Sequence, residues 1–340
     1  MQNGTGPVIL RLNSTVFPMG EPERAILKTL NPRLVEIEGA SDEEISAHAA
    51  EAEAVIIVSA YLHAPVVARL KRCRLISRMG TGVDKIDIEA ATAQGILVTN
   101  IPDFSTAEVA DHTLALLLSV ARQLKAFDSE MRRGMRCTDG KTIHRLAAQT
   151  IGVVGFGRIG KAIARRATGF GLRAIAYDPL IQPGAAGEGG VAMVTLDQLL
   201  AESDYVCLAC PLTATTRGFL GMEQFRRMKR TAVLINTARG ELVVEKDLVA
   251  ALRQGIIHSA ALDVFGEMNV FAPGGFPADH QLFKLDNVML SPHVAALSEE
   301  SLVDVSLRAA QAVVDVLSGR WPAYPVNPEV VPRFPLRREV

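Results

Sequence analysis

Three polar segments in the second half of the sequence carry the residue types of an acid–base site that binds an anionic carbonyl compound. Each follows a short apolar run, and together they contain Arg239, Glu267 and His293. An arginine gives a carboxylate two parallel charge-assisted hydrogen bonds. A histidine can donate a proton to a carbonyl oxygen as hydride reaches the carbon, and a nearby glutamate keeps the imidazole protonated and oriented. Taken singly, Arg239 could also form a surface ion pair, Glu267 could be a solvated loop acid, and His293 could cap a helix or be buried.

A strand, a glycine turn and a helix follow one another from residue 151. The apolar residues 151–154 are typical of a strand that is buried on both faces of a parallel sheet. Gly155, Gly157 and Gly160 then have the G-x-G-x-x-G spacing. In that spacing the first glycine permits a tight turn, the second lets the backbone approach a pyrophosphate, and the third lets the helix pack close to the strand. The pattern predicts a dinucleotide site with its pyrophosphate at the helix N-terminus.

An acidic residue ends the next predicted strand, 173–177. Asp178 follows Gly160 by 18 residues, close to the roughly 20-residue spacing of the acid that binds the ribose 2′-hydroxyl. A carboxylate there accepts hydrogen bonds from the ribose and repels a 2′-phosphate, so the sequence favours NAD over NADP. Pro179 and Leu180 come next, and neither could bind that phosphate. The alternative interpretation of the whole motif is a structural glycine turn in an α/β domain.

These residues need an architecture that brings distant strand ends together. Strands and helices alternate after Asp178, which predicts an α/β fold with a parallel sheet. The carboxyl ends of parallel strands line the ligand crevice of such a fold, so the segments of Arg239 and His293 can converge. A separate alternating series over residues 8–100 predicts a second parallel α/β layer. A long helix over 105–133 lies between the two series and marks a candidate domain boundary.

Composition narrows the class of protein. The chain has 340 residues, of which 49% are hydrophobic and 21% charged, so we expect two domains with large cores. The formal net charge of −1 argues against a nucleic-acid partner. The longest strongly apolar run, 114–120, is too short to span a bilayer, so we expect no membrane partner. The first residues lack the features of a signal peptide, and we expect a cytoplasmic protein.

The four cysteines predict neither a disulfide framework nor a metal site. Cys207 and Cys210 form a C-x-x-C pair, but they lie in a predicted strand, 205–210, where residues three apart face opposite sides. No second pair or nearby group of histidines completes a zinc site. We therefore expect two packed thiols and no metal.

Several motifs in a fixed order resemble one family. The segments GFGRIG, YD, NTARG, ALDVF and SPH, with RMGTGVDKIDIEAA and STAEVADHTLALLL before them, resemble the D-isomer-specific 2-hydroxyacid dehydrogenases. That family includes phosphoglycerate dehydrogenases and the C-terminal-binding-protein corepressors. The resemblance implies two Rossmann-like, doubly wound parallel-sheet domains. It implies a flavodoxin-like, discontinuous substrate domain at 1–104 and 299–340, an NAD-binding domain at 105–298, and a homodimer.

The resemblance also implies roles for particular residues. Arg239 would hold the substrate carboxylate, assisted by the loop of Gly80, Thr81 and Gly82, and His293 would be the acid/base. Asp263 would face the nicotinamide. The implied cofactor contacts are Gly155, Gly157, Arg158, Ile159, Gly160, Asp178, Pro211, Thr237, Ala238, Arg239, Asp263, His293 and Thr113.

The sequence departs from the family at the catalytic glutamate. That residue usually lies five positions after the aspartate of DVF, and here this position is Met268, with Glu267 one place earlier. The segment that follows, 269–280, also looks longer than usual. Either the loop is shifted so that Glu267 reaches His293, or the pair has lost its carboxylate. We expect Glu267 to be the partner.

The resemblance implies an NAD-dependent oxidoreductase that interconverts a 2-keto acid and a D-2-hydroxy acid. The alternative is an NAD(H)-sensing binding protein of the corepressor type with little turnover. A formate-dehydrogenase-like function fits the sequence less well. Arg78, beside the predicted substrate loop, would suit a phosphorylated or dicarboxylic acid, although it could also be the solvated end of a basic run that contains Lys71, Arg72 and Arg74.

Overall fold

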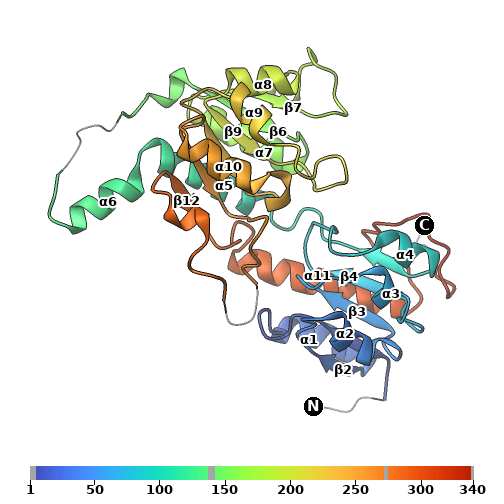
Figure 1. Cartoon of the computed structure of the whole chain (residues 1–340). Helices are drawn as coiled ribbons and strands as arrows, with labels where there is room; N and C mark the ends of the chain where they lie inside the picture. Colours follow the sequence, from blue (N-terminus) through green and yellow to red (C-terminus); the bar gives the residue numbers. More distant parts are fainter. Residues whose placement is uncertain (1–4, 137–141, 272–274, 338–340) are drawn as a thin grey trace. The chain divides into compact units, whose positions relative to one another are not determined.

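The computed structural model describes residues 5–136, 142–271 and 275–337, and the chain divides into two compact units. Unit 1 is Met1–Phe104 with Ser298–Val340, and unit 2 is Ser105–Leu297 (Figure 1). The family resemblance implied boundaries after residues 104 and 298. Each unit holds one parallel sheet, and the expectation of two parallel-sheet α/β domains is confirmed.

Unit 1 is built on a five-stranded sheet with the order β2-β1-β3-β4-β5 and parallel pairing throughout. This is the flavodoxin-like order 2-1-3-4-5. Its strands are β1 (Val8–Arg11), β2 (Arg33–Glu36), β3 (Ala54–Ile57), β4 (Leu75–Arg78) and β5 (Leu97–Thr99). Its helices are α1 (Glu21–Leu27), α2 (Asp42–Ala49), α3 (Ala64–Val67), α4 (Ile88–Ala93) and α11 (Glu299–Leu317).

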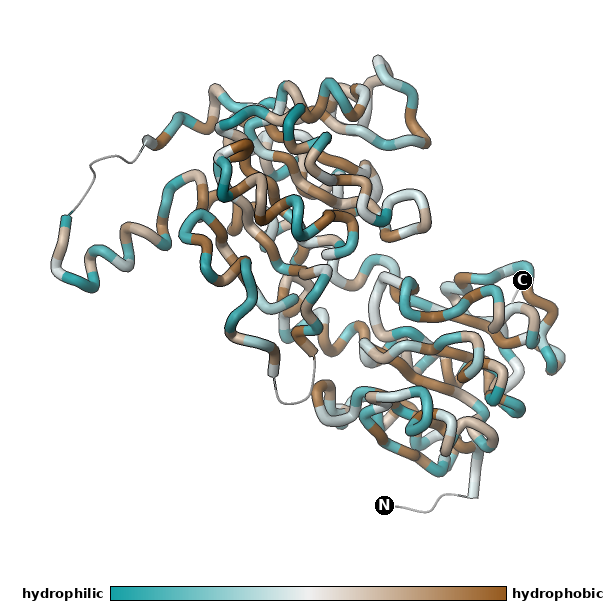
Figure 2. Tube along the Cα trace, in the orientation of Figure 1, coloured by the Kyte–Doolittle hydropathy of each residue, from teal (hydrophilic) through white to brown (hydrophobic). Residues whose placement is uncertain are grey.

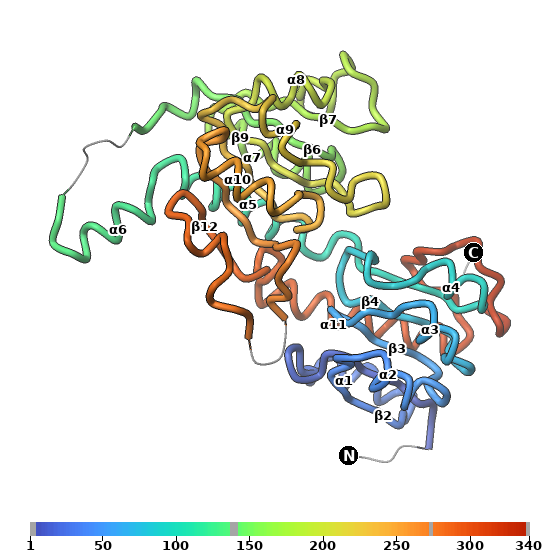
Figure 3. Tube along the Cα trace, in the orientation of Figure 1, coloured from blue at the N-terminus to red at the C-terminus, as the bar shows by residue number. Residues whose placement is uncertain are grey.

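Apolar residues cover both faces of this sheet, because successive strand residues point to opposite sides. Leu10 packs in the cluster that contains α2, α3 and α4, whereas its neighbour Ile9 packs in the cluster that contains α1 and α11. Helix α11 comes from the end of the chain and lies along β3 and β4 (Figure 3). The hydroxyl of Ser77 donates to the carbonyl of Ala309 over 3.0 Å. Unit 1 is therefore completed by residues from both ends of the sequence.

Unit 2 is built on a seven-stranded sheet with the order β12-β11-β10-β9-β6-β7-β8, and every pairing in it is parallel. Counted from β6, the order is the doubly wound 3-2-1-4-5-6 with a seventh strand added. Its strands are β6 (Thr150–Val154), β7 (Arg173–Tyr177), β8 (Ala192–Met193), β9 (Tyr205–Leu208), β10 (Val233–Asn236), β11 (Ser259–Leu262) and β12 (Val288–Leu290).

The helices of unit 2 are α5 (Thr106–Ala121), α6 (Leu124–Arg132), α7 (Arg158–Gly169), α8 (Leu196–Glu202), α9 (Met222–Arg227) and α10 (Glu245–Arg253). Except for α6, which has no buried residue, they pack on the two faces of the sheet. One apolar cluster contains residues of α8, α9 and α10, and the other contains residues of α5 and α7. Figure 2 shows apolar residues concentrated along the strands of each sheet. Short 3₁₀ segments are Lys28–Leu30, Leu146–Ala148, Glu188–Gly190, Gly240–Leu242 and Gln281–Lys284.

The predicted helix over 105–133 is wrong in one respect, because the structure breaks it in two. Helix α5 ends at Ala121, and Gln123 has the left-handed backbone angle φ = 52° before α6 begins at Leu124. Several apolar side chains of α5 are buried, among them Leu114, Leu116 and Leu117, whereas α6 has no buried residue. Packing against the rest of unit 2 therefore fixes the direction of α5, whereas no buried side chain fixes the direction of α6.

Within the described ranges, no helix has the length and apolar character needed to cross a membrane. The cytoplasmic location stays a prediction from the sequence.

Candidate active site

The glycine turn after β6 has the geometry that a dinucleotide requires. Gly155 has φ = +94°, and a Cβ there would lie 2.6 Å from the backbone nitrogen of Cys210. A Cβ on Gly160 would lie 2.0 Å from the carbonyl oxygen of Gly155, so α7 packs directly on the turn. A Cβ on Gly157 would meet nothing within 4 Å. The two outer glycines are thus required by close contacts, and the middle one leaves room for a ligand at the first residue of α7.

Asp178 lies at the end of β7, beside the same turn. One carboxylate oxygen accepts from the backbone N–H of Phe156 over 2.9 Å, and the other accepts from the N–H of Leu180 over 2.9 Å. Burial, and secondly the charge of Asp178, raise the pKa of the Cys210 thiol to about 11. These contacts place the carboxylate next to the open space at Gly157, where a ribose hydroxyl can donate to it.

Asn236 fixes the loop that carries Arg239. This buried residue ends β10, and its side-chain amide donates to the carbonyl of Arg239 over 2.8 Å and accepts from the N–H of Ala238 over 3.0 Å. A Cβ on Gly240 would lie 2.0 Å from the carbonyl carbon of Phe265, so the loops after β10 and β11 are in contact. Arg239 is half-buried, and its guanidinium donates to the carbonyl of Ala238 over 2.7 Å.

Thr113 and Thr237 join this loop to α5. Their hydroxyl oxygens are 2.8 Å apart, and Thr113 donates to the carbonyl of Val109 over 2.7 Å. Thr113 therefore accepts from Thr237. Both residues are buried. In this structure the Thr113 hydroxyl links α5 to the loop by a hydrogen bond. Its contact with the cofactor stays a prediction.

Asp263 holds the segment that contains His293. It follows β11, is completely buried, and accepts from the hydroxyl of Ser291 (2.6 Å) and from the backbone N–H groups of Val294 (3.0 Å) and Ala295 (2.9 Å). These bonds lie on both sides of His293, whose φ of 57° is unusual for a residue with a side chain. Asp263 thus fixes a strained backbone at the candidate acid/base. Its contact with the nicotinamide stays a prediction.

His112 extends this network onto α5. Its Nε2 lies 2.9 Å from the Ser291 hydroxyl and 3.5 Å from the Asp263 carboxylate. Because Ser291 donates to Asp263, it accepts from the N–H of His112. Sequence reasoning did not predict the contact between His112 and Ser291, since nothing in the spacing of the two residues indicates it.

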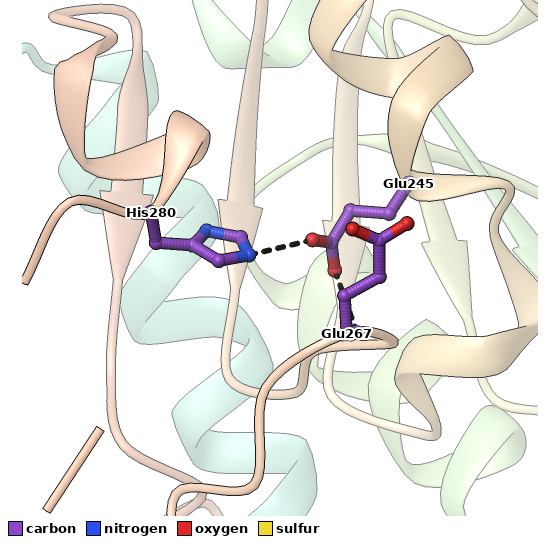
Figure 4. Close-up of side chains that lie close together, drawn as sticks. All are labelled: Glu245, Glu267 and His280. Carbon is purple, nitrogen blue, oxygen red and sulfur yellow. Dashed lines mark hydrogen bonds and ion pairs between the residues drawn. The ribbon is translucent and has the colours of Figure 1, made fainter. Parts of the chain in front are cut away.

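Glu267 lies in a different group from the one expected. Its exposed side chain gathers with Glu245 and His280, with ligand atoms of the three within 4.8 Å of one another (Figure 4). Met268, at the usual family position, is buried. The ring of His293 packs against Phe271, with 4.9 Å between ring centroids and an angle of 45° between planes. The pairing of Glu267 with His293 stays a prediction.

The remaining cofactor candidates lie at the same edge of the sheet. Arg158 and Ile159 begin α7 after β6, and Pro211 follows β9 and accepts from the Thr216 hydroxyl through its carbonyl. Ala238 belongs to the loop after β10. Because all the strands of unit 2 are parallel, their carboxyl ends lie together. Unit 2 thus brings the glycine turn, Asp178 and the segments of Arg239 and His293 to one edge.

Arg78 shapes the candidate substrate loop of unit 1. Its Nε donates to the carbonyl of Gly82 over 2.8 Å, and its Nη1 donates to the carbonyl of Met79. Gly80 has φ = +138°, and a Cβ there would meet the guanidinium of Arg78. The Thr81 hydroxyl donates to the carbonyl of Ile101 over 3.1 Å. The loop is therefore folded around the arginine.

Comparisons with known proteins agree with this geometry. The family profile described as D-isomer specific 2-hydroxyacid dehydrogenase, NAD binding domain, matches residues 114–295. The chain is 40% identical over 274 residues to the glyoxylate reductase of Korarchaeum cryptofilum, covering 79% of this chain and 81% of that one. This chain belongs to the D-isomer specific 2-hydroxyacid dehydrogenase family. It is an oxidoreductase of this family and its cofactor is NAD.

Two further relatives extend the comparison. The chain is 37% identical over 299 residues to the D-3-phosphoglycerate dehydrogenase of Methanocaldococcus jannaschii, covering 87% of this chain but only 55% of that one. This member of the dehydrogenase family thus spans about half the length of that relative. The D-lactate dehydrogenase of Aquifex aeolicus, solved with NAD and lactic acid, has a TM-score of 0.81 at 27% identity, covering 92% of this chain and 96% of that one.

Proposed function

We propose that the protein reduces a small 2-keto acid to the D-2-hydroxy acid and catalyses the reverse reaction, with Arg239 binding the substrate carboxylate and His293 as acid/base. The proposal rests on two buried side chains at one edge of the sheet, those of Asn236 and Asp263. Asn236 holds the loop of Arg239, and Asp263 holds the segment of His293. Both lie at strand ends of the sheet whose β6 leads into the glycine turn.

NAD, when bound, supplies the hydride acceptor or donor. Arg239 binds the keto acid carboxylate with two parallel hydrogen bonds and so orients the adjacent carbonyl. As hydride reaches the carbonyl carbon, the carbonyl π electrons move to oxygen, and that oxygen takes a proton from the imidazolium of His293. In the oxidation direction His293 removes the hydroxyl proton. We propose that the backbone of Gly80, Thr81 and Gly82 assists in binding the carboxylate.

Glu267 remains our proposed carboxylate partner for His293, on the strength of its position beside the family's usual glutamate. If Glu267→Gln leaves turnover and its pH profile unchanged, Glu267 is not that partner.

We propose a small keto acid of the size of glyoxylate or hydroxypyruvate as substrate. The relatives include glyoxylate reductases. The Arg78 guanidinium is already engaged with the carbonyls of Met79 and Gly82. We therefore propose that Arg78 shapes the loop, and its role in binding a phosphorylated or dicarboxylic acid stays an alternative that the substrate panel decides.

A panel of 2-keto acids with NADH and NADPH tests the proposal. We expect NADH oxidation with glyoxylate and hydroxypyruvate, with weaker activity for 2-ketoglutarate and for a phosphorylated keto acid. No turnover with any keto acid would refute the proposal and would favour the NAD(H)-sensing binding protein, an alternative for which the named relatives give no support.

We also propose that the protein is a homodimer. Helix α6 has no buried side chain within its own chain, and Leu124 and Met131 are 53% and 67% exposed. Large exposed apolar side chains grouped on one helix mark an interaction surface, and a second copy of the chain is the occupant we propose.

A further inference from the structure

One buried carboxylate of unit 2 has no part in the proposed reaction. Glu245 is the first residue of α10, is 8% exposed, and accepts from two sides. Its Oε2 accepts from the backbone N–H of Gly266 over 2.9 Å and from that of Glu267 over 3.4 Å. Its Oε1 lies 2.9 Å from Nε2 of His280 (Figure 4). We call Glu245, His280 and the backbone of Gly266 and Glu267 the Glu245 latch.

The hydrogen bonds of His280 show which of its ring nitrogens donates and which accepts. Its Nδ1 accepts from the N–H of Leu282 over 3.4 Å, so the ring proton must be on Nε2. That proton is donated to Glu245. Ligand atoms of Glu245, Glu267 and His280 lie within 4.8 Å of one another, and the contacts of Glu245 in this group are hydrogen bonds with the His280 ring and two backbone N–H groups. The group is therefore a set of hydrogen bonds that holds two chain segments to α10.

The segment that the latch holds leads to the candidate acid/base. From Gly266 the chain runs through Asn269, whose side-chain oxygen accepts from the N–H of Phe271 over 3.1 Å. The ring of Phe271 then packs on the ring of His293, with 4.9 Å between centroids. A fixed start at Gly266 limits where Phe271 can lie. The position of this ring in turn limits the rotation of the His293 imidazole.

We propose that Glu245 is a positioning residue, which acts through the latch and Phe271 to orient His293. The inference rests on the proposed function, because it assumes that His293 is the acid/base. Glu245 does not touch the reacting atoms in this scheme. Its loss should lower kcat, since a misplaced catalytic group costs rate, and should leave the KM for NADH unchanged.

Glu245→Gln is the most informative variant. The amide has the same shape but only one acceptor oxygen, whereas the latch needs one oxygen for the backbone N–H groups and one for His280. One of the two contacts must therefore fail without a change in volume. Glu89→Gln is the matched control, since Glu89 is also in the first turn of a helix, α4, but is exposed.

We expect Glu245→Gln to lower kcat by roughly tenfold or more, with the KM for NADH within about twofold of the parent value and Glu89→Gln without effect. Phe271→Ala should lower kcat similarly, and the double variant should be no slower than the slower single variant, because both changes act on the same contact. Unchanged kcat in Glu245→Gln, or losses in the two single variants that multiply in the double, would overturn the inference.

Hydrogen exchange of the protein without substrate separates this inference from the proposed function. The amides of 266–271 should exchange faster in Glu245→Gln than in the parent or in Glu89→Gln. If the parent protein turns over no keto acid, the proposed function fails. Unchanged exchange over these residues would overturn the latch by itself.

Discussion

The residues that would carry out the chemistry are easier to recognise from the sequence than the residues that hold them in place. Arg239 and His293 belong to segments that follow strands and resemble family motifs, so the sequence predicts them. The two hydrogen bonds of Asn236 and the anchoring of Val294 by Asp263 depend on loop conformation, which the sequence does not specify. Sequence reasoning therefore found the candidate site without the contacts that fix it.

Asp263→Asn tests the anchor of the His293 segment. The carboxylate accepts from a hydroxyl and two backbone N–H groups, and an amide would turn its own N–H₂ toward at least one of these donors. We expect kcat to fall by about a hundredfold and the free energy of unfolding to fall by about 1–3 kcal/mol. Steady-state kinetics and urea unfolding measure the two effects. Asp286→Asn, at an exposed position before β12, is the control, and equal kcat in the two variants would contradict the role given to Asp263.

Asp178→Asn tests the cofactor preference. The change keeps a side chain of the same shape and removes the negative charge that would face a 2′-phosphate. We expect the ratio of kcat/KM for NADH to that for NADPH to fall by at least about tenfold, because a full charge acts over a few ångströms. Both values come from initial rates with one keto acid. A ratio that stays at the parent value would mean that Asp178 does not face the ribose.

Among the helices and strands, those with a strong local sequence pattern were predicted correctly, and those with a weak pattern were not. The strand, glycine turn and helix from β6 to α7 lie where the sequence predicts them, because glycine spacing, strand burial and helix periodicity agree. The helix predicted over 105–133 is divided near Gln123, where side chains become polar and burial no longer fixes the path. Glu245 and His280 gave no signal, since their contact joins the start of α10 to a distant loop.

The proposed homodimer can be tested at helix α6. Leu124 and Met131 are seven residues apart, so they lie on the same side of the helix. A glutamate at Met131 would place a charge in a dimer interface at this surface, and we expect the protein to become monomeric. Light scattering after size-exclusion chromatography measures the mass. Ser129→Glu adds the same charge about 140° around the helix from Leu124 and should stay dimeric. A monomeric parent protein, or a dimeric Met131→Glu protein, would contradict the proposal.

At the scale of the whole molecule, the sequence predicted two parallel α/β units, and the family resemblance supplied their discontinuity. Alternating strands and helices indicate a parallel sheet, but they do not give the order of its strands. They also do not show that α11 covers the sheet of unit 1, since that packing joins Ser77 to Ala309 across most of the chain. Such contacts depend on the complementary shapes of surfaces that form only on folding.

The thiols of Cys73, which is buried, and Cys210, which is partly buried, should make the stability of the folded chain depend on pH. Burial raises the pKa of Cys73 from 9.0 to about 12, and burial with the charge of Asp178 raises that of Cys210 from 9.0 to about 11. Above about pH 9 the unfolded chain loses these protons and the folded chain keeps them. The free energy of unfolding should therefore fall as pH rises from about 9 to about 11, by up to about 1.4 kcal/mol per pH unit for each thiol.

Urea unfolding at about pH 8 and about pH 10 measures this slope. In Cys73→Ala the fall should be smaller, because one of the titrating groups is gone. A slope that is the same in Cys73→Ala and in the parent would show that other groups control the alkaline stability.

In the proposed reaction, Arg239 binds the carboxylate of a 2-keto acid beside bound NADH. The most direct test is the steady-state kcat/KM for glyoxylate in Arg239→Lys, which keeps the positive charge and loses the paired hydrogen bonds. We predict a fall of roughly ten- to a hundredfold, larger than any change in the Kd for NADH. Arg226→Lys, at an exposed arginine of α9, should behave like the parent. A kcat/KM for glyoxylate in Arg239→Lys equal to that of the parent would show that Arg239 does not bind the substrate carboxylate.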